Sequence, residues 1–169
     1  MRILWAPWRS RYVERIDSFR DCFLCEAISQ PKNLWRRFLV LYRSERSFII
    51  LNKYPYNSGH LMIVPLEHTG SYEDLEEETV LDMDRLLRLS LKTLRRAFNP
   101  HGFNIGYNFG RSAGAGLESH LHMHVVPRWN GDTNFMPVLA ETKVIPQDLF
   151  TTYDRLRKAL EEILEGEGA

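Results

Sequence analysis

The chain has 169 residues, of which 44% are hydrophobic and 12% aromatic, a composition typical of a globular core and not of a disordered segment. Lysine plus arginine and aspartate plus glutamate number 22 each, so the formal net charge is zero and lacks the positive excess of a general nucleic-acid-binding protein. Neither a run of about 18 apolar residues nor the apolar stretch of a signal peptide occurs. We therefore expect one domain over residues 1–169, located in the cytoplasm, with no nucleic-acid or membrane partner.

The first part of the chain is predicted to form an arm followed by strands. Residues 1–35 are irregular and rich in Trp, Pro and Arg, with one short helix expected around the sequence CEAIS. Three apolar runs then have the composition of strands, and Pro, Asn and Gly residues mark a turn between the second run and the third. These predicted strands span 38–42, 47–51 and 60–65.

A long amphipathic helix is predicted over 76–98, where apolar residues recur at intervals of three and four. Glutamates crowd its first turn and arginines its last, as the helix dipole favours. A second amphipathic helix is expected over about 147–165. The buried face of the first helix should carry Val80, Met83, Leu87, Leu91, Leu94 and Phe98, and that of the second Leu149, Tyr153, Leu156, Leu160 and Ile163.

Between these helices, the sequence alternates between apolar and polar residues. Residues 103–109 alternate strictly, which predicts a half-buried strand, and a glycine-rich loop follows over 110–119. Strands in a row, with one central and one terminal helix, predict an α+β fold with an antiparallel sheet of about five strands and helices packed on one face.

Three histidines, His120, His122 and His124, alternate with apolar residues directly after the glycine-rich loop. The pleat of a strand would place all three on the polar face of the sheet, together with Asn108 of the neighbouring strand. They could form a solvated polar face, or bind one zinc ion with an open coordination position. In a third interpretation, one neutral imidazole attacks a substrate while its neighbours fix its tautomer and supply a proton.

The sequence HLHMHVV resembles the motif of the histidine triad (HIT) family, His-φ-His-φ-His-φ-φ, with every position filled. LNKYPYNSGHLMIVP is similar to the strand–turn–strand block of that family, and NFGRSAGAGLESHLHMHVVPRW to its phosphate loop and triad. The resemblance covers roughly residues 20–130. Within the family, LWAPWRSRY, NKYPYNSGHLM, HGFNIGYN, HLHMHVVPRWNGDTNF and TKVIPQ resemble the bacterial diadenosine tetraphosphate phosphorylases and related dinucleoside polyphosphate enzymes.

This resemblance implies a HIT-like fold and a nucleotidyl hydrolase or transferase. His122 would attack the α-phosphorus of a dinucleoside polyphosphate and carry a nucleotidyl intermediate, which water or inorganic phosphate would then release. His124 would hydrogen-bond the phosphate or the leaving group, and the backbone carbonyl of His120 or a neighbour would orient the ring of His122.

The resemblance also implies which residues bind the nucleotide. Asn52 matches the ribose-binding position, although a turn residue ahead of Pro55 explains it equally well. In the loop, the implied phosphate contacts are Asn108, Ser112, Gly114 and Gly116; Gly116 would offer only its backbone, because many relatives have Gln or Ser there. His60 could be a structural histidine or could support the triad. Trp5, Trp8 and Trp129 could stack a second purine, although such residues more often pack in the protein interior.

Cys22 and Cys25 have the spacing of half a zinc site, and a single CxxC without a secretion signal favours metal or redox chemistry over a structural disulfide. Zinc-bearing HIT relatives imply that His68 and His120 complete a structural Cys₂His₂ site. Its four protein ligands would leave no open position, so the metal would orient His120 and would not activate water. The alternative is two reduced cysteines that pack as small apolar residues.

Several functional alternatives remain open at this point. The same residues are compatible with a HIT phosphoramidase that cleaves P–N bonds, with a nucleotide-binding module of little turnover, or with a metalloenzyme that binds zinc through all three triad histidines. The family resemblance further implies a homodimer. The sequence leaves open whether phosphate or water accepts the nucleotide, which base is preferred, and how long the polyphosphate is.

Overall fold

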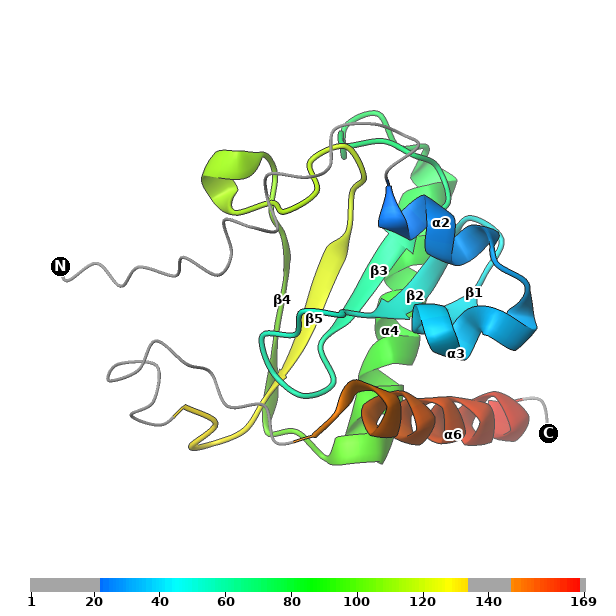
Figure 1. Ribbon diagram of the computed structural model, residues 1–169, viewed down its shortest axis with the longest axis vertical. Helices are drawn as coiled ribbons and strands as arrows, with labels where there is room; N and C mark the ends of the chain where they lie inside the picture. The colour runs from blue at the N-terminus through cyan, green and yellow to red at the C-terminus, as the bar shows by residue number, and fades with distance from the viewer. Residues whose placement is uncertain (1–21, 134–146, 168–169) are drawn as a thin grey trace, which may run out of the picture.

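The computed structural model describes residues 22–133 and 147–167, and Figure 1 shows how they are arranged. One 5-stranded antiparallel sheet has the strand order β1-β2-β3-β5-β4, which confirms the predicted α+β class. The strands are β1 (Val40–Arg43), β2 (Ser47–Leu51), β3 (Leu61–Pro65), β4 (Gly102–Tyr107) and β5 (Met123–Arg128). The helices are α2 (Phe23–Ser29), α3 (Trp35–Phe38), α4 (Glu77–Phe98) and α6 (Leu149–Glu167), with 3-10 turns η3 (Lys32–Leu34) and η4 (Arg111–Ala113).

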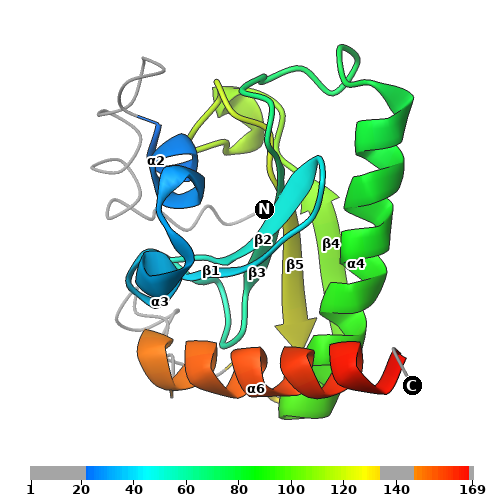
Figure 2. The ribbon, with the colours of Figure 1, turned by 90° about the vertical axis from the view of Figure 1, so that its right-hand side faces the viewer.

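Helix α4 packs along one face of the sheet and confirms the long predicted helix (Figure 2). The predicted buried stripe is wrong in its centre, because the helix turns Leu86, and not Leu87, fully into the core. Small polar residues also lie on the buried face, where they let the helix approach the strands, and apolar periodicity does not report them. The buried residues are Thr79, Asp82, Met83, Leu86, Ser90, Thr93 and Leu94, whereas Val80, Leu87, Leu91 and Phe98 are partly buried.

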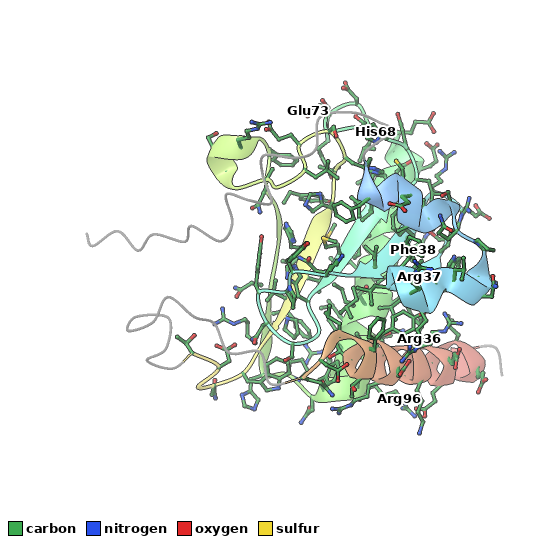
Figure 3. The ribbon with its side chains drawn as sticks, in the orientation of Figure 1. Arg36, Arg37, Phe38, His68, Glu73 and Arg96 are labelled. Atoms are coloured by element: carbon green, nitrogen blue, oxygen red, sulfur yellow. The ribbon has the colours of Figure 1, made fainter. Side chains whose placement is uncertain are left out.

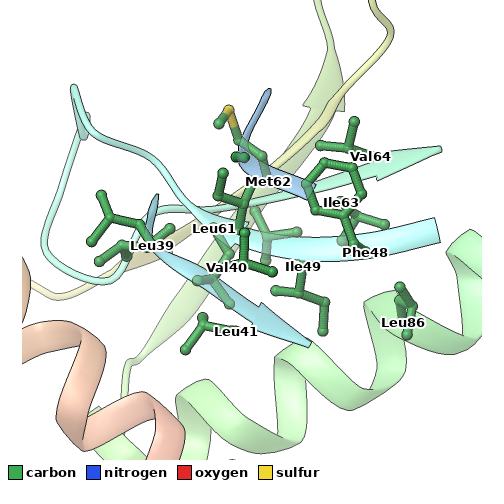
Figure 4. Close-up of a cluster of buried hydrophobic side chains, with 14 of the residues drawn as sticks. Leu39, Val40, Leu41, Phe48, Ile49, Leu61, Met62, Ile63, Val64 and Leu86 are labelled. Atoms are coloured by element: carbon green, nitrogen blue, oxygen red, sulfur yellow. The ribbon is translucent and has the colours of Figure 1, made fainter. Parts of the chain in front are cut away.

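The core is built around the strands β1, β2 and β3, with α4 on one side and buried residues of α2 and α3, such as Leu24 and Trp35, in the same cluster (Figure 4). Every residue of β2 and β3 is buried on one face of the sheet or the other. This explains why the sequences of these two strands are mostly apolar throughout and do not alternate between apolar and polar residues. Phe48, Ile49, Leu61 and Ile63 are exposed by 2% or less. Complete burial of such a side chain contributes about 1.5–3 kcal/mol relative to exposure, which makes these central strands a stable base for the site.

The first predicted strand begins two residues too early. Phe38 is the last residue of α3, and Leu39 adopts a left-handed conformation with φ 63°, so that β1 starts at Val40. A non-glycine residue rarely takes this conformation, and an apolar side chain gives no sequence signal for it. Leu39 is itself buried, which indicates that packing compensates for the strained backbone.

The remaining helices lie at the β1 end of the sheet. Helix α2 confirms the predicted short helix, whereas α3 and η3 were not expected. Figures 1 and 2 show α2 and α3 on the side of the sheet opposite α4. The expectation of helices packed on one face therefore describes α4, but it does not describe α2 and α3. The predicted C-terminal helix is confirmed as α6, whose Tyr153 hydroxyl donates to the carbonyl of Val40 at 2.9 Å.

Strand β4 forms an edge of the sheet and is less buried than the alternation of 103–109 predicted. Ile105 is 45% exposed and Phe109 51%, although Ile105 pairs with the buried Val125 of β5. Helix α4 packs mainly against β2 and β3, and the guanidinium of its Arg95 lies 5.1 Å from the centre of the Phe103 ring, so among the described residues β4 is covered only in part.

No helix in the described part of the chain has both the length and the apolar character needed to cross a membrane. The prediction that residues 1–169 form one domain stays a prediction. Trp5 and Trp8 lie outside the described residues.

Candidate active site

The alternation of the histidine segment is present in the structure, although β5 begins only at Met123. Leu121, Met123 and Val125 are buried on the side of α4, as predicted. His124 lies opposite Met62 of β3 and Gly106 of β4 in the ladder. The polar face of β5 is therefore the face that α4 leaves uncovered.

A backbone hydrogen bond defines the tautomer of His122. Its Nδ1 lies 2.8 Å from the carbonyl oxygen of His120, and because a carbonyl only accepts, Nδ1 carries the proton. Nε2 then has the lone pair of a neutral imidazole. Burial lowers the pKa of His122, while the bond to His120 acts in the opposite direction. The ring thus stays neutral and presents a nucleophilic Nε2.

His60 defines the tautomer of His124 in the same manner. The backbone N–H of Tyr56 donates to Nδ1 of His60 at 3.0 Å, so the proton of His60 is on Nε2. This Nε2–H donates to Nδ1 of His124 at 2.9 Å, which leaves the proton of neutral His124 on its own Nε2. Burial, and then the neighbouring His124 and His122, lower the pKa of His60 to about 3. Of the two interpretations of His60, the contact with His124 favours support of the triad.

Asn108 lies where the sequence placed it, beside the histidines. The amide nitrogen of Asn108, Nδ2, is 3.4 Å from Nε2 of His124. Two donors cannot share a hydrogen bond, so with the proton of His124 on Nε2 the amide of Asn108 has to be turned over, which brings its oxygen to face Nε2. A phosphate oxygen at this position would accept from His124 and from the amide nitrogen of Asn108.

The side chain of Asn52 makes hydrogen bonds within its own turn, at the polar atoms that a ribose would otherwise contact. Its side-chain oxygen accepts from the N–H of Tyr54 at 2.9 Å, and its amide nitrogen lies 3.3 Å from Nδ1 of His60. The residue is 8% exposed. These contacts support the interpretation as a turn residue and show in addition that Asn52 helps to hold His60.

The glycine loop, residues 110–116, turns back on itself next to Asn108. Gly110 and Gly114 have φ values of 75° and 92°, which favour glycine, and η4 lies between them. The N–H of Gly114 donates to the carbonyl of Arg111 at 2.9 Å, so the loop itself uses the amide expected to bind phosphate. No such bond engages the amide of Gly116 within residues 22–133 and 147–167, and Ser112 is exposed.

Cys22, Cys25, His68 and His120 form a thiol–imidazole cluster whose ligand atoms all lie within 4.8 Å of one another. Nδ1 of His120 is 3.3 Å from Sγ of Cys22, and Nδ1 of His68 is 3.2 Å from Sγ of Cys25. Figure 3 shows His68 in the loop that follows β3, near α2. The cluster thus joins three segments that are distant in the sequence.

This cluster has the chemistry of a structural zinc site. Two thiols and two imidazole nitrogens are a typical tetrahedral donor set. Nε2 of His120 donates to the carbonyl of Pro65 at 2.9 Å, so its Nδ1 has the lone pair that faces the thiols. Burial, then the neighbouring Cys22, raise the pKa of the Cys25 thiol to about 12, a penalty that a bound cation would offset.

Some contacts of the site escaped prediction. The contact of the Pro65 carbonyl with His120 was not predicted, because a backbone contact leaves no sequence signal. The contact of the His120 carbonyl with His122 was expected only from the family resemblance. Tyr56 has a ring 5.4 Å from that of His124, centroid to centroid, and lies in the same block as His60. Its place in the same sequence block as His60 was the signal that could have predicted this contact.

Comparison with known proteins places this geometry in a family. The HIT domain matches residues 37–131. An AP-4-A phosphorylase of Mycobacterium tuberculosis is 38% identical over 154 residues, which are 88% of this chain and 79% of that protein. The chain therefore belongs to the HIT family, as its sequence motif indicated.

Two further relatives support this assignment. A zinc-bound histidine triad family protein from Mycobacterium smegmatis superposes with a TM-score of 0.68 and 27% identity, over 87% of this chain and 98% of that one. A bis(5'-nucleosyl)-tetraphosphatase [asymmetrical] of Schizosaccharomyces pombe is 28% identical over 93 residues, 55% of this chain and 50% of that protein.

The tautomers assigned above can be measured directly. In a long-range ¹H–¹⁵N correlation spectrum, His122 should carry its proton on Nδ1, whereas His60 and His124 should carry theirs on Nε2. The signals of His60 should not titrate between about pH 8 and pH 5, a range in which a histidine of ordinary pKa, about 6.5, does. A proton on Nε2 of His122 would contradict the assignment of the nucleophilic nitrogen.

Proposed function

We propose that the protein is a nucleotidyl hydrolase or transferase that cleaves dinucleoside polyphosphates of the diadenosine tetraphosphate type through a nucleotidyl intermediate on His122. The observation that carries this proposal is the 2.8 Å hydrogen bond from Nδ1 of His122 to the carbonyl of His120, which leaves Nε2 with the lone pair of a neutral, nucleophilic imidazole. The relatives named a phosphorylase and a tetraphosphatase support the substrate class.

The reaction consists of two displacements at the α-phosphorus. In the first, the lone pair of Nε2 of His122 forms a bond to phosphorus, and the bond from phosphorus to the bridging oxygen breaks. Nε2–H of His124 donates a hydrogen bond to the departing oxygen, which keeps the bonding electron pair and leaves as an ionised terminal phosphate oxygen of the second nucleotide. In the second, an oxygen of water or inorganic phosphate attacks phosphorus, the bond to His122 breaks and its electron pair returns to Nε2; where water is the acceptor, its proton passes to solvent. Two steps with a covalent intermediate lower each barrier relative to one direct displacement.

The groups that would bind the α-phosphate come from the triad, from Asn108 beside Nε2 of His124, and from the glycine loop. We assign this role to the amides of Asn108 and Gly116, to the hydroxyl of Ser112 and to Nε2–H of His124. Because Gly114 uses its N–H inside the loop, its contribution would be to shape the turn. Asn52 keeps the ribose-binding role only if nucleotide binding releases its contact with the turn.

Incubation with diadenosine tetraphosphate, with and without inorganic phosphate, tests the reaction. A phosphorylase yields ADP and ATP only with phosphate, and a hydrolase yields AMP and ATP without it. Two ADP without phosphate would show a hydrolase that attacks the β-phosphorus and would contradict attack at the α-phosphorus. His122→Ala should lower kcat about a thousandfold or more with the fold intact, because the covalent route is lost.

The matched control for this variant is His101→Ala, which removes an exposed histidine that bonds the backbone of Asn130 and should leave turnover unchanged. Unaltered turnover in His122→Ala would exclude the mechanism. Cleavage of an adenylated amine, but not of diadenosine tetraphosphate, would favour the phosphoramidase, and binding without turnover would favour the nucleotide-binding module.

We also propose that Cys22, Cys25, His68 and His120 hold one structural zinc ion. When bound, the metal would supply a rigid cross-link between α2, the loop after β3 and the segment before β5. The chain itself transmits that rigidity to the nucleophile, because His120 offers its ring to the cluster and its carbonyl to His122.

Cys25→Ser should reduce the zinc content measured by elemental analysis well below one ion per chain. It should also lower the thermal midpoint by about 6–12 °C, the shift that a loss of about 3 kcal/mol produces in a chain of this size. Ser29→Ala, on the same helix outside the cluster, is the control and should change neither. If chelation abolishes turnover while the midpoint stays constant, the metal is catalytic and the structural role is wrong.

We further propose a homodimer, in the cytoplasm, that uses the edge strand β4. The exposure of Ile105 at 45% on an edge strand supports this interface. Ile105→Arg should convert a dimer to a monomer in sedimentation velocity, whereas Leu164→Arg, at an exposed position of α6, should not. A wild-type chain that sediments as a monomer at micromolar concentration would refute the dimer.

A further inference from the structure

The glycine loop, residues 110–116, contains one arginine, Arg111, which is the first residue of η4. Its Nε donates to the carboxylate of Glu118, and the two side chains are 57% and 43% exposed. Arg111 follows Asn108 by three residues, and Glu118 precedes His120 by two. Figure 1 shows this loop, with η4, at the end of β4. The ion pair therefore links the two ends of the loop, one next to Asn108 and the other next to the triad.

The departing polyphosphate leaves the site on the side of this loop. In the proposed reaction, Nε2–H of His124 donates to the oxygen that departs from phosphorus, and this Nε2 faces the side-chain amide of Asn108. Three residues span at most about 10–11 Å, so Arg111 lies within that distance of Asn108 along the chain. A chain of several phosphates that begins at His124 and passes Asn108 therefore extends towards the glycine loop.

The departing chain requires positive charge, because its terminal oxygen keeps the electron pair of the broken bond and its other phosphates are ionised as well. Burial lowers the pKa of His60 to about 3 and also lowers the pKa of His122, so these two rings are neutral. Between the start of β4 and the end of β5, residues 102–128, the sequence has two basic side chains besides histidine, Arg111 and Arg128. One of these arginines is therefore the expected source of positive charge on this side of the site.

The two arginines differ in their place and in their partners. Arg128, at the far end of β5, donates through Nε and Nη2 to both carboxylate oxygens of Asp132, at 2.7 and 2.9 Å, and through Nη1 to Asn104 at 2.7 Å. Arg111 is in the loop next to the departing oxygen, and its ion pair with Glu118 lies at the surface, where such a pair contributes little to stability. A guanidinium forms charge-assisted hydrogen bonds with phosphate, so a phosphate oxygen can replace the carboxylate of Glu118 at low cost.

We infer that Arg111 exchanges Glu118 for the polyphosphate chain of the departing nucleotide, and that it thereby selects substrates with phosphates beyond the α-phosphate. This inference rests on the proposed function and adds a specificity-determining residue to it. Before the substrate binds, the carboxylate of Glu118 holds the guanidinium at the end of the loop. After binding, a phosphate oxygen of the departing chain accepts from the guanidinium, which also stabilises the charge that this chain gains when its bond to the α-phosphorus breaks.

The test compares diadenosine tetraphosphate with the nitrophenyl ester of AMP, which reacts at the same α-phosphorus but has no phosphate in its leaving group. Arg111→Ala should raise KM for the dinucleotide about tenfold, at the lower end of what a hydrogen bond to a charged group contributes. It should leave KM for the nitrophenyl ester unchanged. Arg88→Ala, which removes an exposed arginine that pairs with Asp84 on α4, is the matched control and should affect neither substrate.

A second variant distinguishes phosphate binding from an ion pair that only holds the loop. Glu118→Gln removes the carboxylate that competes for Arg111, so it should lower KM for the dinucleotide and not raise it. If the ion pair only holds the loop, Glu118→Gln and Arg111→Ala should both raise KM for both substrates. That result, or an unchanged KM for the dinucleotide in Arg111→Ala, would overturn the inference while the proposed reaction stands. If the wild-type protein cleaves neither substrate, the proposed reaction itself fails, and the role of Arg111 with it.

Discussion

The hydrogen bond between Nδ1 of His122 and the carbonyl of His120 is the interaction on which the site depends. It fixes which nitrogen of the central histidine is a nucleophile, and it does so through the backbone of the residue whose side chain belongs to the thiol–imidazole cluster. One residue thereby joins helix α2, the loop after β3 and the reacting nitrogen. A displacement of His120 would disturb its side-chain contacts and the orientation of the nucleophile together.

The other triad histidine obtains its tautomer from a different part of the chain. Tyr56 orients His60 and His60 orients His124, so two adjacent histidines on one face carry their protons on different nitrogens. Burial disfavours the protonated form of His60 and His122, so Nε2 of His122 keeps its lone pair as the nucleophile and His60 keeps the single proton that it donates to His124. The division of roles follows from backbone and side-chain contacts, since the three residues are chemically identical.

Much of this arrangement was predictable because short-range rules decide it. A period of two places the histidines on one face and Leu121, Met123 and Val125 on the other, and apolar spacing predicts both long helices. The rest depends on long-range packing. Residues distant in the sequence, which no local pattern identifies, decide four features. These are the left-handed conformation of Leu39, the centre of the buried face of α4, the exposure of β4, and the use of the Gly114 amide inside its own loop. The family resemblance implied that His68 lies close to Cys22 and Cys25, and the ligand atoms of these residues do lie within 4.8 Å of one another in the structure.

The most direct test of the account is to quench the enzyme during turnover of diadenosine tetraphosphate and to locate the bound nucleotide by tandem mass spectrometry. The account predicts an acid-labile, base-stable nucleotidyl group on the imidazole of His122, absent from the His122→Ala variant. A nucleotidyl group on His124, His120 or any other residue would contradict it. So would single-turnover kinetics in which product forms with no covalent intermediate.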